Sequence, residues 1–235
     1  HKARLIEALG MPYLLVLQFD EEFAAQPAEV FIRALAAACR PLRKICVGAQ
    51  WAFGHNRTGN AALLRKLGDE LGFTVTETPP VAVHGEIVSS TRIRKAVEHG
   101  DLGIARMLLG RDYTILGTVE HGNELGRKIG FPTANLRAHN EQFPPDGVYA
   151  VRVQLGDAIL PGVANVGYRP TVSGVLSERK LEVHVFDFEG DLYERDMDVD
   201  FISFLRGEKK FETLEDLKAQ IGVDAEKARR MLKSR

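Results

Sequence analysis

Residues 117–136 read GTVEHGNELGRKIGFPTANL, and this glycine-rich stretch is the starting point for the rest of the chain. The β-forming residues at and just before its start favour a strand. Gly122, Gly126 and Gly130 then interrupt regular structure. Because glycine tolerates unusual backbone angles and lets backbone amides come close to a ligand, the stretch predicts a strand followed by a ligand-binding loop.

The stretch ends in a hydroxyl and an amide, Thr133 and Asn135, with Ala134 between them. In an extended segment these two side chains point to the same side. Polar oxygens beside a glycine-lined loop suit a magnesium-bound phosphate. The same pattern is also typical of a glycine-rich hairpin with a polar edge, and the spacing by itself leaves both interpretations open.

Composition places the chain among globular proteins with a proper core. The 235 residues fit one large or two ordinary domains, and 45% are hydrophobic and 27% charged. A formal net charge of -1 argues against wholesale binding of nucleic acid or of a membrane surface. Two cysteines form no disulfide framework, which favours a reduced, cytoplasmic setting.

Several other classes of protein are disfavoured by missing patterns. The seven histidines show no H-x-x-x-H spacing, so we do not expect a zinc site. No apolar run approaches the roughly 20 residues of a membrane span, and no signal peptide is visible. Residues 2–9 resemble the tail of a helix closed by Gly10, with no initiator Met before them. We therefore expect that the natural start of the protein is missing from this sequence.

The first part of the chain alternates between helical and strand patterns. A continuous apolar run at 13–19 is typical of a strand covered on both faces. This alternation predicts a parallel α/β sheet. The expected strands are 13–19, 45–47 and 73–76, and the expected helices are 30–39, 60–71, 89–100 and 101–110.

After Gly110 the pattern changes to closely spaced strands separated by turn residues. Such spacing predicts a small closed antiparallel barrel. The expected strands are 113–120, 147–155, 162–166, 180–188 and 197–205. A helix should follow over 213–233, capped by Thr213 with Asp216, buried along Leu214, Leu217 and Ile221, and kinked or restarted at 222–224. We therefore predict an α/β domain over 1–110 and a β-barrel domain with a C-terminal helix over 111–235.

Two stretches of the first domain could bind a ligand. Residues 89–95, SSTRIRK, place hydroxyls at a helix start and basic side chains nearby, which suits an anion such as a phosphate. An ordinary N-cap followed by a solvated basic turn explains the same residues equally well. Residues 48–59 follow a strand end, where α/β sheets bind ligands. Trp51 and Phe53 there either stack on a planar ring or belong to the core, and the core is the better interpretation.

In the second domain, the strand around Glu182 separates two faces. Leu181, Val183 and Val185 alternate onto one face, so Glu182 and His184 share the other. Outside the barrel, Glu182 could act as a base toward a substrate hydroxyl, although an isolated Glu is more often a solvated surface carboxylate. His184 is interpreted as structural or solvated. Residues 206–211, RGEKKF, form either a charged loop or a lid over a ligand.

Together these stretches resemble the bacterial bifunctional riboflavin kinase/FMN adenylyltransferase family, also called FAD synthetases, over almost the whole chain. GRKIGFPTAN at 126–135 resembles the riboflavin kinase signature. Further motifs follow in the family order: DGVYA at 146–150, ANVGYRPTV at 164–172, LEVHVFDF at 181–188, DLY at 191–193 and LRGEKKF at 205–211.

The resemblance implies roles for residues of the second domain. It implies that ATP phosphates and Mg²⁺ bind at Thr133 and Asn135, with Gly126, Gly130 and Pro132 shaping the ATP site. It implies that Glu182 is the catalytic base. It also implies that Arg206 and Glu208 contact the flavin, which would be bound as riboflavin, FMN or FAD.

The first domain resembles the adenylyltransferase module of the same family, which implies a Rossmann-like nucleotidyltransferase domain. SSTRIR at 89–94 matches its phosphate-binding signature, which implies nucleotide binding by Gly48, Ser90, Thr91, Arg92 and Arg94. Two departures concern the segment 48–54, where Gln50 and Trp51 replace the usual Asn or Asp and Phe. The H-x-G-H motif of the family is also missing from this sequence.

The implied chemistry is phosphorylation of riboflavin to FMN, followed in the full-length protein by adenylylation of FMN to FAD. The expected partners are the small molecules riboflavin, FMN and ATP, with no nucleic acid or membrane and with a homo-oligomer possible. One alternative is a riboflavin kinase whose first domain is inactive or regulatory. The other is a flavin-binding protein without enzymatic activity.

Overall fold

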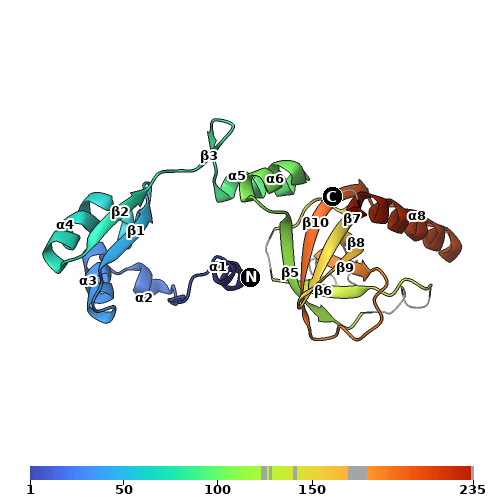
Figure 1. Ribbon diagram of the computed structural model, residues 1–235, viewed down its shortest axis with the longest axis horizontal. Helices are drawn as coiled ribbons and strands as arrows, with labels where there is room; N and C mark the ends of the chain where they lie inside the picture. Colours follow the sequence, from blue (N-terminus) through green and yellow to red (C-terminus); the bar gives the residue numbers. More distant parts are fainter. Residues whose placement is uncertain (123–125, 127–128, 140–141, 169–178, 234–235) are drawn as a thin grey trace. The chain divides into compact units, whose positions relative to one another are not determined.

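The computed structural model describes the chain except for residues 123–125, 127–128, 140–141, 169–178 and 234–235. The chain divides into two compact units, Lys2–Val88 and Ser89–Arg235 (Figure 1). Each unit has its own core, and each is described here by itself.

The first unit is built on a parallel pair of strands. Strands β1 (Lys44–Gly48) and β2 (Thr74–Thr78) pair in parallel, as the alternating pattern predicts. They are connected through α4 (Ala61–Leu71), where Asn60 accepts the Leu63 N–H at 3.0 Å and Gly72 ends the helix at φ 81°. The remaining elements are α1 (Lys2–Ala8), α2 (Glu21–Ala24), α3 (Ala28–Ala38), η1 (His55–Arg57), β3 (Ala82–Val83) and β4 (Glu86–Ile87).

The core of this unit lies between α3, α4 and the strand pair. Phe53 is buried in it, and the Trp51 ring stacks on Phe53 with centroids 4.3 Å apart. The preferred core interpretation is therefore confirmed for Phe53. The stacked Trp51 remains half-buried beside it.

The strand predicted over 13–19 is wrong for this structure. No strand forms there, and the side chains are exposed, with Tyr13 at 91% and Val16 and Phe19 at 78%. A doubly covered strand needs neighbours that satisfy its backbone groups and cover both faces. Among the described residues β1 pairs only with β2, so this apolar run has no strand partner to stabilise it.

The second unit begins with two helices and continues into the predicted barrel. The helices are α5 (Ser90–Glu98) and α6 (Leu102–Leu109). Among the described residues, six strands close antiparallel in the order β10-β5-β6-β9-β8-β7. They are β5 (Tyr113–Glu120), β6 (Ala134–Ala138), β7 (Gly147–Leu155), β8 (Ala158–Tyr168), β9 (Arg179–Val185) and β10 (Asp196–Arg206).

Strand alternation fills the barrel as the sequence predicts. Leu181, Val183 and Val185 of β9 are buried in the main core, and Glu182 and His184 are half-buried on the opposite face. The barrel thus uses one face of each strand for its interior. The other face of β9, with Glu182 and His184, points away from the barrel core.

The C-terminal helix α8 (Leu214–Lys233) packs against β7, β8 and β10 (Figure 1). Thr213 and Asp216 cap it as predicted, with the Asp216 N–H 3.1 Å from the Thr213 hydroxyl. The predicted kink at 222–224 is wrong, because the helix continues through it and buries Asp224 and Ala225.

The predicted buried stripe of α8 is also partly wrong. Leu214 is 52% exposed, and Leu217 and Ile221 line a cavity instead of a closed core. The residues that pack onto the barrel are Ala225 and Ala228. No helix in the described ranges is long and apolar enough to cross a membrane.

Candidate active site

The loop before β6 is shaped by its glycines. The Gly126 carbonyl accepts the N–H groups of Ile129, at 3.2 Å, and Phe131, at 2.8 Å. A side chain at Gly126 would collide with the Phe131 carbonyl, and Gly130 has φ 88°. Both positions therefore require glycine, as the sequence predicts for a loop that approaches a ligand closely.

Three polar side chains lie side by side across adjacent strands. Asn135 of β6 is directly opposite Glu182 of β9, and Asn165 of β8 is opposite Glu182 on its other side. Residues directly opposite one another in antiparallel strands share a face, so the Glu182 carboxylate stands between two amides. Gly122 leaves room for this row, because a Cβ there would overlap the Asn135 amide.

His184 connects this row to the glycine loop. Its Nδ1 lies 2.7 Å from the Pro132 carbonyl oxygen, and its ring meets Phe131 edge-on at 5.4 Å. Since Pro132 immediately precedes Thr133, this contact fixes the entry of Thr133 into the site. A ring nitrogen in contact with a carbonyl must carry a proton, so Nδ1 is the donor.

A cavity of about 530 Å³ gathers the predicted kinase residues on the outside of the barrel wall. Of the predicted site residues it brings together Gly126, Thr133, Glu182, Arg206 and Glu208. Apolar side chains from the barrel and α8 complete its walls, as expected for a site that takes a planar organic ring. The further lining residues include Val148, Val163, Asn165, His184, Lys209, Lys210, Phe211, Leu217, Ile221 and Asp224.

The loop after β10 closes one side of this cavity. Arg206 forms an ion pair with Asp224 of α8, and its guanidinium carbon is 5.8 Å from the centre of the Phe211 ring. The Glu208 carboxylate lies against Gly167, where a Cβ would overlap it. The loop therefore lines the cavity, and its role as a lid over a ligand stays a prediction.

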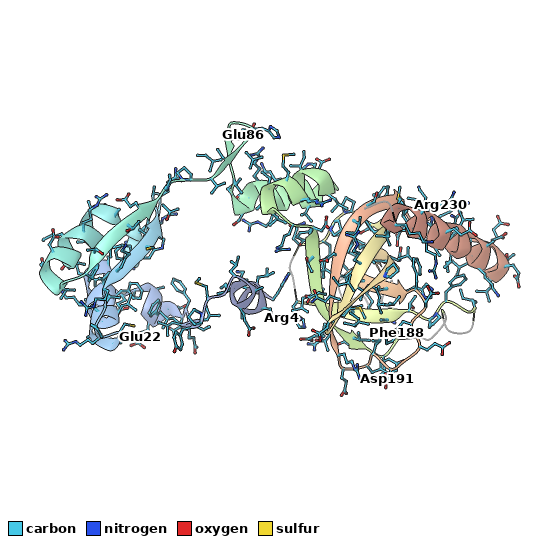
Figure 2. The ribbon with its side chains drawn as sticks, in the orientation of Figure 1. Arg4, Glu22, Glu86, Phe188, Asp191 and Arg230 are labelled. Atoms are coloured by element: carbon cyan, nitrogen blue, oxygen red, sulfur yellow. The ribbon has the colours of Figure 1, made fainter. Side chains whose placement is uncertain are left out.

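A second cavity, of about 640 Å³, meets the first at Thr133. Pro132 and Ala134 also line it, together with the loop after β9 that carries Phe188 and Asp191 (Figure 2). The Tyr193 ring in this loop stacks on His121 at 3.8 Å between centroids. Thr133 is thus placed between two spaces, each large enough for part of a ligand.

The residues predicted for a nucleotide site of the first domain divide between the units. Gly48 ends β1 in the first unit, whereas Ser90, Thr91, Arg92 and Arg94 lie on α5 in the second. The helix begins as predicted, with the Ser89 hydroxyl accepting the Arg92 N–H at 3.2 Å.

Sequence reasoning missed several residues of the site. Asn165 belongs to a motif that the resemblance rests on, and its alternation with Ala164 and Val166 could have placed it on the outer face of β8. His184 shares a face with Glu182, but only the fold brings the Pro132 carbonyl to it. No sequence signal places Asp224 beside Arg206. The motif parts at 127–128 and 169–172 lie outside the described residues.

The donor set suits magnesium and a nucleotide. Thr133, Asn135 and Glu182 offer hydroxyl, amide and carboxylate oxygens, which hard divalent cations prefer. Within the described residues, no group of three or more His, Cys, Asp or Glu side chains is arranged to hold a metal.

Comparison with known proteins accounts for both parts of the chain. Residues 109–232 match the riboflavin kinase family model, and residues 1–92 match the FAD synthetase model. The bifunctional riboflavin kinase/FMN adenylyltransferase of Escherichia coli K12 is 43% identical over 229 residues, covering 97% of this chain and 72% of that protein. The protein of the same name from Haemophilus influenzae is 41% identical over 234 residues, covering 99% and 75%.

A solved structure is similar over the same extent. A crystal structure described as a macrolide-efflux protein from Streptococcus pneumoniae is 33% identical with a TM-score of 0.81, covering 97% of this chain and 73% of its own. The motifs, the barrel with its C-terminal helix and the two matching family models agree. This chain belongs to the bifunctional riboflavin kinase/FMN adenylyltransferase family.

Proposed function

We propose that the barrel unit transfers the γ-phosphoryl group of ATP to the 5′-hydroxyl of riboflavin and so forms FMN. The observation that carries the proposal is the arrangement around Thr133. This residue joins two cavities and lies beside the row that contains Asn135 and Glu182. A kinase needs this order of parts: an acceptor site, a phosphate site and a base between them.

The residues divide the work of the reaction. Riboflavin occupies the cavity between the barrel wall and α8, where Arg206 and Glu208 contact the flavin. The phosphates of ATP lie along the glycine loop at Gly126, Gly130 and Pro132, and the rest of the nucleotide extends into the second cavity. Thr133 and Asn135 would hold Mg²⁺, which neutralises phosphate charge when bound.

Glu182 acts on the acceptor hydroxyl. Its carboxylate takes the proton as the hydroxyl oxygen forms a bond to the γ-phosphorus and the bond to the ADP oxygen breaks. Asn135 and Asn165 lie opposite Glu182 on the two neighbouring strands, so an amide side chain stands on each side of it. Most of the acceleration comes from positioning and charge neutralisation, because the protein forms no covalent bond to the phosphoryl group.

We further propose that residues 1–110 supply an FMN adenylyltransferase module and residues 111–235 the kinase module. Ser90, Thr91, Arg92 and Arg94 hold nucleotide phosphates at the start of α5. Gly48, at the end of β1, is proposed separately as a nucleotide contact of the first unit. Transfer of AMP from ATP to FMN then gives FAD and pyrophosphate. The expected setting is the cytoplasm, with small-molecule partners only and with homo-oligomers possible.

A second candidate is a riboflavin kinase whose first domain is inactive or regulatory. Incubation of the full-length protein with riboflavin, ATP and Mg²⁺, followed by chromatographic separation of FMN from FAD, distinguishes the two. FAD formation rejects the kinase-only candidate. FMN as the sole product supports it.

Glu182→Gln tests the kinase assignment directly. The variant keeps the size of the side chain but cannot accept a proton, so kcat for FMN formation should fall by about 10²- to 10⁴-fold. Riboflavin binding, followed by the change in flavin fluorescence, should stay within a factor of two or so. The exposed Glu226→Gln on α8 is the matched control, and near-full activity of Glu182→Gln would remove the base from this mechanism.

A further inference from the structure

Asp224 is a buried carboxylate of α8 that holds a residue of the flavin cavity. Its side chain is 6% exposed, and both of its oxygens contact Arg206. Arg206 Nε lies 2.9 Å from Oδ2 and 3.2 Å from Oδ1, and Nη2 lies 2.8 Å from Oδ2. Gln220, one turn earlier on α8, donates to Oδ1 at 3.0 Å. Gln220 thus positions the Asp224 carboxylate, and this carboxylate in turn positions the Arg206 guanidinium.

Arg206 is fixed on its other sides as well. Nη1 donates to the Gly207 carbonyl at 2.9 Å, and the Phe211 ring lies near the guanidinium. A guanidinium carries five N–H donors, and these contacts use Nε and one donor on each terminal nitrogen. Among the contacts made by the described residues, one donor on each of Nη1 and Nη2 is left for a ligand in the cavity that Arg206 lines.

A second tie docks α8 without touching Arg206. Lys227 Nζ donates to the Leu205 carbonyl at 3.0 Å, next to Arg206 in β10. Together with the packing of Ala225 and Ala228, this contact holds the helix on the barrel. Docking of α8 and orientation of Arg206 can therefore be separated by mutation.

Stability alone is a weak reason for such a pair. Removing two charges from water offsets most of their attraction, so packed apolar residues of similar volume often stabilise a protein as well or better. An immobilised arginine, however, loses less conformational entropy when a ligand binds. The pair lies at the wall of the cavity that takes the flavin in the proposed function, where this advantage applies.

We propose that Asp224 is a positioning residue for flavin binding, which acts by presenting the terminal nitrogens of Arg206 to the flavin. The C-terminal helix is then part of the substrate site and not only a cover for the barrel. This inference rests on the proposed function for the identity of the ligand.

The test measures riboflavin affinity without ATP, by the change in flavin fluorescence. Asp224→Asn keeps the shape of the side chain but loses the charge, and the dissociation constant should rise by about tenfold, the loss expected for a charge-assisted hydrogen bond. KM for riboflavin should rise in parallel, whereas kcat at saturating riboflavin should stay within about twofold. A fall in kcat with unchanged affinity would overturn the proposal.

A double-mutant cycle tests whether Asp224 acts through Arg206. Arg206→Ala should weaken binding at least as much as Asp224→Asn, and the double variant should bind no more weakly than Arg206→Ala alone. Additive losses would show that Asp224 acts independently of Arg206, which would overturn the proposal.

Lys227→Met serves as the control for helix docking. It removes the tie to the Leu205 carbonyl and should lower thermal stability while riboflavin affinity stays within about twofold. If it weakens flavin binding as much as Asp224→Asn does, the role of Asp224 is only to dock the helix. Glu226→Gln, an exposed change of the same charge on the same helix, should leave both properties unchanged.

If Asp224→Asn does not fold, Gln220→Ala is measured in its place. Gln220→Ala removes one hydrogen bond to Asp224 and should raise the dissociation constant by about threefold, and no change would contradict the proposal. Wild-type protein that binds riboflavin but forms no FMN would refute the proposed kinase while leaving these affinity comparisons valid. Wild-type protein that binds no riboflavin would overturn both.

Discussion

At the scale of single residues, the site depends on what stands next to Glu182. An isolated carboxylate on a strand is usually solvated, and the sequence pattern alone favours that interpretation. The fold places an amide from each neighbouring strand beside it, Asn135 on one side and Asn165 on the other. The register puts all three polar side chains on the outer face of the barrel, where the proposed base would meet the substrate hydroxyl.

Thr133 and Asn135 should matter for the nucleotide and not for the flavin. Replacing both by Ala removes the oxygens that would hold Mg²⁺ and the phosphates, so kcat/KM for MgATP should fall by about 10²-fold or more. Riboflavin affinity measured without ATP should change little. Steady-state kinetics over a range of ATP and Mg²⁺ concentrations provide the measurement, and an unchanged ATP dependence would contradict the assignment.

At the scale of elements, β9 and the glycine loop are linked by a hydrogen bond between a side chain of β9 and the backbone of the loop. His184 on β9 contacts the Pro132 carbonyl at 2.7 Å, across 52 residues of sequence. The face of β9 that carries the proposed base therefore also positions the proposed phosphate loop. The sequence placed His184 on this face but left it without a role.

His184→Ala should loosen the phosphate loop. Loss of one hydrogen bond is worth about 1 kcal/mol, so KM for ATP should rise by up to about fivefold with a smaller effect on kcat. His184→Asn retains an N–H donor and should recover part of the loss. His139→Ala, an exposed histidine of the same barrel, is the control. Equal ATP dependence in His184→Ala and wild type would show that the tie is not needed.

At the scale of the whole molecule, the two compact units need not follow the two activities. The chain divides after Val88, whereas the change in sequence pattern falls near Gly110. Helices α5 and α6 belong to the compact unit of the barrel, although α5 carries the residues proposed for the adenylyltransferase. The boundary between the two proposed activities therefore has to be tested separately from the boundary between the two compact units.

Substitution of Arg92 and Arg94 in the full-length protein tests whether the start of α5 serves the adenylyltransferase. Replacing both by Ala removes the cations proposed to hold phosphates at the start of α5, so FAD formation from FMN should fall by about tenfold or more. FMN formation from riboflavin should be retained. Separate assays of the two steps decide the outcome, with the exposed Lys66→Ala of α4 as control. Parallel loss of both activities would contradict the assignment to the adenylyltransferase.

The pH dependence of barrel stability should depend on Asp200 of β10. Burial raises the pKa of this carboxyl above its ordinary value of 3.8, and Asp112 and Asp198 nearby act in the same direction. Arg111 and the hydrogen bond donated by Thr114, at 2.6 Å, lower the pKa in part. The folded state thus holds the proton more tightly than the unfolded chain.

The sign of the effect follows from this raised pKa. Between 3.8 and the folded-state pKa the folded protein binds more protons, so stability falls as pH rises through that window and stays lower above it. Asp200→Asn should remove this penalty and raise Tm at pH 7 by about 2 °C, with little change below pH 3.8. Circular dichroism melts across pH measure the effect, with the exposed Asp157→Asn as control. Lower stability of Asp200→Asn at pH 7 would contradict it.

The sequence by itself determined the elements whose pattern is local. Alternating residues placed Leu181, Val183 and Val185 inside a barrel and Glu182 outside it, because strand periodicity depends only on neighbours in the chain. Asn60, Gly72 and Thr213 set helix ends for the same reason. The glycines of the proposed phosphate loop were also readable from the sequence: a Cβ at Gly126 would overlap the Phe131 carbonyl, and Gly130 adopts a φ of 88°.

Only the tertiary structure decided what depends on contacts between distant parts of the chain. The apolar run at 13–19 has the pattern of a buried strand and forms none, because a strand needs partners that its own sequence cannot supply. Helix α8 continues through 222–224, where the sequence predicts a kink, and the carboxylate of Asp224 in that stretch is held by Arg206. Pairing across strands placed Asn165 beside Glu182, and a fold-dependent contact gave His184 the Pro132 carbonyl. The residue types of the site can therefore be read from the local sequence, whereas the positions of these residues relative to one another depend on the tertiary structure.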